Sequence, residues 1–186
     1  ALARRMLWEE PALSDALLGA ITDATLAYLQ AQIDAGVHVV QLFDSWAGSL
    51  SRKLYVERVL PHMQKVLDGL KGQVPITVFA KGGAHFLEDL MGLPCTTVGI
   101  DWQTDRREAR QWANAAPGGP LALQGNLDPS VLYANPGIIR AETHQMIAEL
   151  GMKRTIANLG HGLYPDIPKE HGQAFVRAVK EFKPDY

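Results

Sequence analysis

Polar and glycine-rich residues follow five short apolar segments of the sequence. They include carboxylates, amides, a serine, a lysine and a histidine, the side chains that bind substrates and move protons at enzyme sites. The five stretches are Asp44-Ser45-Trp46-Ala47-Gly48, Lys81-Gly82-Gly83, Asp101-Trp102, Gln124-Gly125-Asn126-Leu127-Asp128-Pro129 and Asn158-Leu159-Gly160-His161-Gly162. If the apolar segments are parallel strands, these residues lie at the carboxyl ends, where α/β proteins bind their ligands.

His161, Ser45 and Lys81 each have a functional and a structural interpretation. His161 stands between Gly160 and Gly162, whose backbone freedom suits a loop at a site, and an imidazole changes charge near neutral pH. A serine after a strand commonly caps the next helix instead of acting as a nucleophile. Lys81 beside two glycines could reach an anion, although lysines are usually solvated. A Ser45–His161 pair across a ligand-binding mouth is conceivable, but nothing in the sequence establishes their contact.

The carboxylates and amides at the strand ends have the same two interpretations. Asp44 and Asp128 are placed to cap the elements that follow them. Asp101 is a stronger candidate, because a carboxylate at the end of a buried strand needs a partner. Asn126 and Asn158 either bind a ligand or hold neighbouring loops.

Apolar strands alternate with segments of helical periodicity along the whole chain. The pattern predicts strands at residues 37–43, 75–80, 96–100, 120–123 and 155–159, with His38 as a hydrogen-bonded histidine of the sheet. It predicts helices from Pro11 to a stop at Gly36, at 52–70 with a restart at Pro61, and at 86–91, 106–113, 136–150 and 168–182. Expected core faces are Leu17, Ile21, Tyr28, Leu29 and Ile33; Ile139, Thr143, Met146, Ile147 and Leu150; and Phe175, Val176, Val179 and Phe182.

Five strand–helix alternations predict an α/β protein with a parallel sheet, which both flavodoxin-like and barrel folds contain. Polar residues at all five strand ends favour the (β/α)8 TIM barrel, because all its strand ends meet at one mouth. A complete barrel needs about 250 residues, whereas this chain has 186 and begins at Ala1. We therefore expect residues 1–186 to form a single partial domain, the C-terminal part of a barrel with about five parallel strands.

Composition narrows the classes of function. The 18 basic and 20 acidic residues give a net charge of -2, so no basic field is available for nucleic acid. The lone Cys95 cannot form an intramolecular disulfide or a thiolate-rich metal cluster, which suits a reducing, cytoplasmic compartment. We expect no membrane span, because no apolar run approaches about 20 residues. Phosphate-loop, nucleophile-elbow and zinc-helix motifs do not occur in the sequence.

The strand-end motifs, taken together, resemble those of the uroporphyrinogen decarboxylase family. The matching stretches are residues 43–48, 78–82, 99–102, 123–129 and 156–165, which cover nearly the whole chain. The resemblance implies a (β/α)8 barrel that needs no cofactor or metal and acts as a homodimer in heme and other tetrapyrrole biosynthesis. Its implied reaction converts the four acetate side chains of uroporphyrinogen to methyl groups, releasing carbon dioxide and leaving coproporphyrinogen.

The resemblance carries two site residues onto this sequence. It implies that Ser45 and His161 bind and orient substrate, with His161 the catalytic residue closer to proton transfer. The family's substrate-binding arginines, its aspartate that binds pyrrole N–H groups and its active-site tyrosine match nothing here and belong upstream of Ala1. The segment alone is therefore expected to be inactive.

Two alternatives stay open. Zinc-dependent methyltransferases that act with corrinoid or thiol partners share the same barrel, but they need cysteine and histidine ligands at two strand ends. The corresponding positions here are Ala80-Lys81-Gly82 and Leu159-Gly160-His161. The second alternative is a non-catalytic, truncated chain whose open strand edge and apolar faces persist only through dimerisation or domain exchange.

Overall fold

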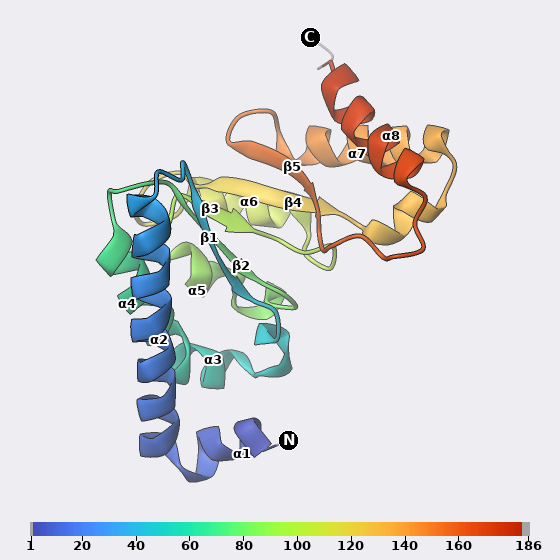
Figure 1. The fold of residues 1–186 in the computed structure, drawn as a ribbon. Helices are drawn as coiled ribbons and strands as arrows, with labels where there is room; N and C mark the ends of the chain where they lie inside the picture. Colours follow the sequence, from blue (N-terminus) through green and yellow to red (C-terminus); the bar gives the residue numbers. More distant parts are fainter. Residues whose placement is uncertain (1, 184–186) are drawn as a thin grey trace. The chain divides into compact units, whose positions relative to one another are not determined.

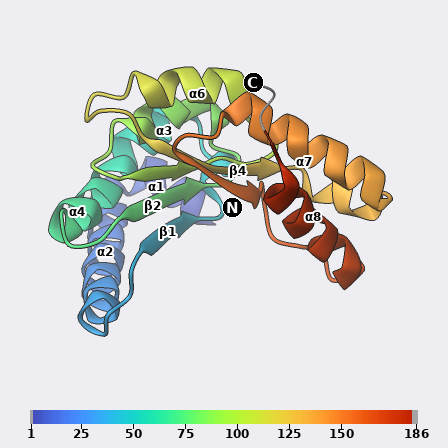
Figure 2. The ribbon, with the colours of Figure 1, turned by 90° about the horizontal axis from the view of Figure 1, so that it is seen from above.

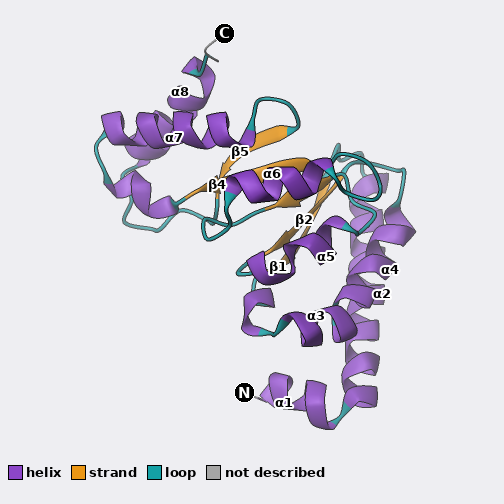
Figure 3. Cartoon of the chain, turned by 180° about the vertical axis from the view of Figure 1, so that it is seen from behind, coloured by secondary structure: helices purple, strands orange, loops and turns teal. Residues whose placement is uncertain are grey.

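The computed structural model describes residues 2–183, in which helices alternate with five parallel strands (Figures 1 and 3). The chain divides into two compact units, Ala1–Thr97 and Val98–Tyr186. Strand β3 (Thr97–Gly99) carries the chain from unit 1 into unit 2.

The described part of unit 1, from Leu2 onward, contains two strands before β3 and five helices. The helices are α1 (Leu2–Glu9), α2 (Pro11–Asp34), α3 (Arg52–Arg58), α4 (Leu60–Leu70) and α5 (Leu87–Met91), and the strands are β1 (Val40–Asp44) and β2 (Ile76–Ala80). Short 3-10 helices lie at η1 (Ala47–Ser49) and η2 (Ala84–Phe86). The sequence predicted both strands and the proline that begins α2, but His38 lies exposed in a bend before β1 rather than in the sheet.

The strands and helices of unit 1 enclose an aromatic core. β1 pairs with β2 in parallel, with Asp44 opposite Ala80, so that both strands end side by side. Thr96, just before β3, exchanges hydrogen bonds with Ile76 of β2. Beneath the strands, the ring of Tyr55 stacks on Phe86 at 4.0 Å between centroids. Both rings are buried, and Tyr55 links this aromatic pair to Asp44 at the end of β1.

Helix α2 differs from the expected core helix. Of its expected core face, Leu29 is buried, whereas Leu17, Ile21 and Tyr28 are exposed. The helix packs against α4 (Figure 1) and also contacts α1, and these contacts leave Leu17, Ile21 and Tyr28 exposed. By length and composition, α2 is also the described helix that meets the requirement for crossing a membrane, a test that core helices of soluble proteins pass as well.

Up to Lys183, where the described residues end, unit 2 contains two strands after β3 and three helices. The strands are β4 (Ala122–Leu127) and β5 (Thr155–Leu159), and the helices are α6 (Arg106–Asn114), α7 (Pro136–Leu150) and α8 (Lys169–Glu181), with a 3-10 helix η3 (Pro129–Tyr133). β4 pairs with β5 in parallel, with Leu127 opposite Leu159, and Ile100 after β3 donates its N–H to the carbonyl of Gln124. The strand order is β1-β2-β3-β4-β5, which is the chain order of a (β/α) barrel.

Two expectations for unit 2 are corrected by the structure. β4 continues to Leu127 instead of ending at residue 123, because Asn126 is buried with its polar atoms hydrogen bonded and therefore need not leave the strand. In α8 the buried residues are Ala174 and Ala178, while Val176 is exposed. Small side chains allow α8 to approach α7, its neighbour in Figure 2, where the ring of His144 also bonds the carbonyl of Ala178 at 3.0 Å. The expected face of α7, by contrast, is fully confirmed.

Candidate active site

Ser45 lies in the exposed loop that follows β1. The backbone N–H of Trp46 donates to Oδ1 of Asp44 at 3.3 Å, which bends the chain immediately after the strand. The N-cap of η1 is Trp46, and α3 is capped by Ser51, so Ser45 does not serve as the helix cap that its position suggested. Ser45 is an exposed residue at the carboxyl end of β1.

Backbone contacts with the loop after β2 hold the Ser45 loop in place. The N–H of Lys81 donates to the carbonyl of Asp44 at 3.0 Å, and the N–H of Gly48 donates to the carbonyl of Lys81 at 2.9 Å. A Cβ at Gly48 would lie 2.6 Å from Cα of Gly82, so only glycine permits this approach. The backbone of Lys81 is therefore hydrogen bonded to the Ser45 loop on both sides of Ser45.

Tyr55 supports the same loop from the core. Burial, followed by the negative charge of Asp44 and a hydrogen bond with it, raises the pKa of Tyr55 well above its ordinary value. Sδ of Met63 lies 2.9 Å from the same hydroxyl oxygen. Tyr55 consequently remains a neutral hydrogen-bond donor and has a structural role, which the sequence alone did not suggest.

His161 lies in the exposed loop that follows β5. The N–H of Gly160 donates to the carbonyl of Leu127 at 2.7 Å, which ties the start of the loop to the end of β4. A Cβ at Gly160 would collide with the backbone nitrogen of Trp102. The rings of Trp102 and His161 are nearly perpendicular, at 81°, with their centroids 6.0 Å apart.

Buried Asn126 joins the end of β4 to the turn after β3. Its Nδ2 donates to the carbonyls of Asp101 at 2.8 Å and Thr104 at 3.0 Å, and its Oδ1 accepts from Nε of Arg106 at 2.7 Å. Asp101 is also buried, and its Oδ1 accepts from the N–H of Gln103 and the hydroxyl of Thr104. These bonds favour the structural interpretation of Asn126 and supply the partner that Asp101 was expected to need.

An ion pair anchors this network to α7. Arg106 donates from its Nη1 to Oε2 of Glu149 at 2.8 Å, and less than a fifth of either side chain is exposed. The hydrogen bond from Arg106 is the main cause that lowers the pKa of Glu149. The sequence did not identify either residue as part of the site. The N-cap at Asp105 could have pointed to Arg106, because it places Arg106 at the first position of α6.

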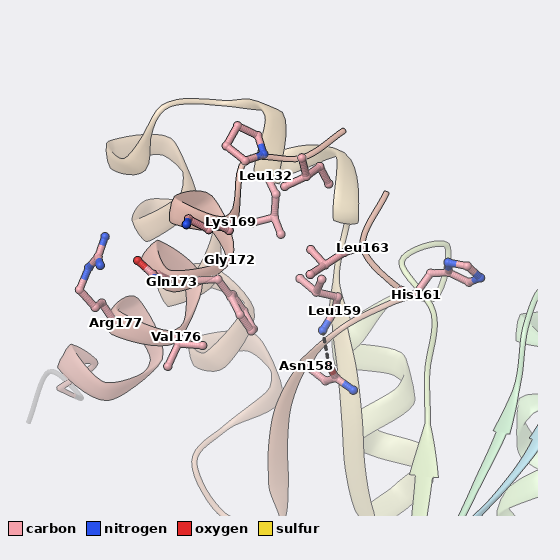
Figure 4. Close-up of a pocket in the computed structure, with 14 residues that line it drawn as sticks. Leu132, Asn158, Leu159, His161, Leu163, Lys169, Gly172, Gln173, Val176 and Arg177 are labelled. Carbon is pink, nitrogen blue, oxygen red and sulfur yellow. Dashed lines mark hydrogen bonds between the residues drawn. The ribbon is translucent and has the colours of Figure 1, made fainter. Parts of the chain in front are cut away.

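A cavity of about 820 Å³ lies between the His161 loop and α8 in unit 2. Figure 4 shows His161 at the end farthest from α8, with Leu132, Leu159 and Leu163 between them. Lys169, Gln173 and Arg177 line the opposite side. Oδ1 of Asn158 accepts a hydrogen bond from the N–H of Leu159 at 2.9 Å. The cavity is mainly apolar with cationic groups at one side, which suits an apolar body bearing acidic substituents.

The structure thus gathers the expected residues into two groups. Asp44, Ser45 and Lys81 lie together at the strand ends of unit 1. Trp102, Asn126 and the loop of His161 lie together in unit 2, where Asp128 takes the expected cap role by accepting from the N–H of Ser130 at 2.8 Å.

The histidine, cysteine and carboxylate side chains of the described residues offer no metal-binding group. Among residues 2–183, no three or more histidine, cysteine, aspartate and glutamate side chains are grouped to hold a metal ion. Cys95 is buried, and this burial raises the pKa of its thiol to about 11, so the protonated form is favoured. Its thiol therefore differs from the exposed thiolates that bind zinc at strand ends.

Parallel strands in chain order, with candidate side chains in the loops after their carboxyl ends, define part of a (β/α) barrel of the enzyme type. The family model described as uroporphyrinogen decarboxylase (URO-D) matches residues 1–182. The chain belongs to the uroporphyrinogen decarboxylase family.

Curated relatives agree with the family model. A uroporphyrinogen decarboxylase from Azotobacter vinelandii is 44% identical over 99% of this chain and 52% of the relative. One from Hydrogenovibrio crunogenus is 42% identical over 98% of this chain and 52% of the relative. The chain therefore spans about half the length of the curated relatives it matches.

A solved structure extends the comparison to the fold. A methyltransferase from Methanosarcina mazei superimposes with a TM-score of 0.82 at 19% identity, over 96% of this chain and 52% of that chain. At this identity the likeness concerns the fold alone. It confirms the expected partial barrel.

Proposed function

We propose that this chain forms the substrate-orienting half of an enzyme that decarboxylates uroporphyrinogen to coproporphyrinogen in tetrapyrrole biosynthesis. The observation that carries the proposal is the family match over residues 1–182, with Ser45 and His161 in exposed loops after β1 and β5. The curated relatives bear the same activity in their names.

The reaction is within the means of side chains alone. Protonation of a pyrrole ring carbon creates an electron sink; the bond between the acetate methylene and its carboxylate then breaks, and its electron pair flows into the ring. Carbon dioxide leaves, the methylene carbon takes up a proton to become a methyl group, and the ring proton is returned. The protein contributes orientation of the departing carboxylate and placement of protons, without a cofactor or metal.

Ser45 and His161 fit complementary parts of this task. The hydroxyl of Ser45 donates a hydrogen bond to a substrate carboxylate, and a protonated His161 donates a charge-assisted one. His161 adjoins the cavity with Lys169 and Arg177, so an acidic ligand meets cationic groups there. We assign both residues to substrate binding and His161 to the proton-transfer step.

Partners and location complete the proposal. The enzyme acts as a cytoplasmic homodimer that binds neither nucleic acid nor membrane. A net charge of -2 argues against binding to nucleic acid, and the single, buried Cys95 suits a reducing compartment such as the cytoplasm. The exposed Leu17, Ile21 and Tyr28 of α2 support burial against further protein, either the other half of the barrel or a second subunit.

The test uses a chimera in which this chain replaces the matched half of the Azotobacter vinelandii relative. The chimera is expected to convert uroporphyrinogen to coproporphyrinogen, whereas the 186-residue chain alone is expected to be inactive. His161→Asn should lower turnover about 100-fold, as loss of an acid–base group does. Ser45→Ala should lower it about 10-fold, as loss of one hydrogen bond to a charged group does. Chromatography of the porphyrins should then show partly decarboxylated intermediates.

His38→Asn and Ser49→Ala are matched controls, because both residues are exposed and His38 lies before β1 rather than after it. Both controls should retain full turnover. A folded chimera without activity would refute the proposed reaction, and turnover by the chain alone would refute the division of the site between two halves. Unchanged product patterns in the Ser45 and His161 variants would remove the roles assigned to them.

A further inference from the structure

Trp102 is an aromatic neighbour of His161 that the proposed reaction does not use. Its indole stands nearly perpendicular to the imidazole, with the ring centroids 6.0 Å apart, within the range of favourable edge-to-face pairs. Trp102 is half-buried, whereas His161 is exposed. The indole is therefore the more firmly held member of the pair.

The backbone keeps the two rings at this separation. Gly160, the residue before His161, lies so close to the backbone of Trp102 that a Cβ would collide with the Trp102 nitrogen. The N–H of Gly160 is bonded to the carbonyl of Leu127 at 2.7 Å, so the loop cannot move away without losing that bond. The backbone of the residue before His161 is therefore fixed beside Trp102.

The turn that carries Trp102 is itself held from three sides. Oδ1 of Asp101 closes the turn by accepting from Gln103 N–H at 3.1 Å, and Asn126 of β4 bonds the carbonyls on both sides of Trp102, those of Asp101 and Thr104. Arg106 of α6 then fixes the amide of Asn126. The half-buried indole that faces the exposed imidazole is therefore carried by a turn that the buried, hydrogen-bonded side chains of Asp101 and Asn126 hold in place.

We propose that Trp102 is a positioning residue that restricts the orientation of the His161 imidazole. An exposed side chain otherwise samples several rotamers, and a proton donor must be held near its productive geometry. Trp102 acts through His161 and does not itself touch the reacting atoms. The relevance of this orientation to catalysis rests on the proposed function; the positioning itself does not.

The test is NMR spectroscopy of the 186-residue chain without ligand, with histidine ring signals assigned through His161→Asn. A perpendicular indole displaces the signals of a neighbouring imidazole through its ring current. Trp102→Ala should abolish most of the displacement of the His161 signals and average its χ1 couplings over several rotamers. Trp102→Phe, which keeps an aromatic ring, should restore most of the displacement and a dominant rotamer. Trp112→Ala is the matched control, because Trp112 is a half-buried tryptophan of α6 in the same unit.

The outcomes separate the proposal from the assigned reaction. Loss with alanine, rescue with phenylalanine and no change with Trp112→Ala support positioning by Trp102. Unchanged His161 signals in Trp102→Ala overturn it, as does an equal change in Trp112→Ala. If Trp102→Ala does not fold, Trp102→Phe decides: restored rotamer preference supports the proposal, and an averaged rotamer overturns it. An inactive chimera would contradict the reaction while leaving these spectra unaffected.

Discussion

The Ser45 loop follows β1 and the His161 loop follows β5, and different contacts hold the two loops in place. The Ser45 loop is tied to its neighbour by backbone hydrogen bonds and by the mutual approach of Gly48 and Gly82. The His161 loop also uses a glycine, but the turn it leans on is held by the buried side chains of Asn126 and Asp101. The first loop therefore depends on backbone hydrogen bonds, two glycines and the contact of Tyr55 with Asp44, and the second on a glycine and a network of buried polar side chains.

The largest effect is expected from Gly160→Ala, because its methyl group would collide with the backbone of Trp102, which the network prevents from moving. We expect a loss of about 3 kcal/mol in the free energy of unfolding, measured by urea denaturation. Gly162→Ala, in the same loop, meets no atom within 4 Å and should change stability by less than about 0.5 kcal/mol. Equal effects of the two substitutions would contradict the close approach.

Asn126→Ala should destabilise by about 2 kcal/mol, because it leaves two carbonyls and the Nε of Arg106 without their partner. Asn114→Ala, at the exposed end of α6, is the control and should be nearly neutral. Urea denaturation provides the comparison. A neutral Asn126→Ala would show that this turn is held without the side chain of Asn126.

Gly48→Ala should destabilise by about 1.5 kcal/mol, because a Cβ would lie 2.6 Å from Cα of Gly82, but Gly48 is exposed and its loop can shift toward solvent. Gly19→Ala is the control, since Gly19 lies within α2 with no atom near its Cβ position and alanine favours helix. Thermal denaturation should show a decrease for the first and an increase for the second. A larger loss at Gly48 than at Gly160 would reverse the proposed difference in loop rigidity.

The smallest effect concerns pH. The folded-state pKa of Glu149 lies below its ordinary value of 4.5, so the unfolded state binds a proton first as pH falls. The stabilisation is therefore complete above the ordinary pKa and is lost as pH falls through the lowered value. Glu149→Gln should lose roughly 1 kcal/mol at pH 7 and show a shallower loss of stability in acid. Denaturation at neutral and acid pH measures this, and equal acid slopes would contradict it.

The sequence predicted the main elements because their signals are local. Alternating apolar and helical segments located the five strands, and Pro11 and Asp105 marked the starts of helices that the structure contains. The spacing of apolar residues did not predict which residues of a helix are buried where burial depends on how closely another helix packs. Val176 was expected in the core, but the approach of α8 to α7 buries Ala174 and Ala178 instead.

The sequence predicted where the candidate site residues lie, but not the residues that hold their loops in place. The family motifs placed Ser45 and His161 in strand-end loops, where the structure has them. The structural support for these loops was missed, because Tyr55, Arg106 and Glu149 act through contacts with residues distant in the chain. No local pattern marks a tyrosine or an arginine for such a role.

The sequence by itself determined the family, the alternation of strands and helices, and which polar residues follow the strands. Tertiary structure decided what these residues do, because their partners are brought together only by folding. Asn126 is a strand residue because Asp101 and Thr104 satisfy its amide. His161 faces an indole because Gly160 permits two loops to approach to a distance that any side chain would prevent.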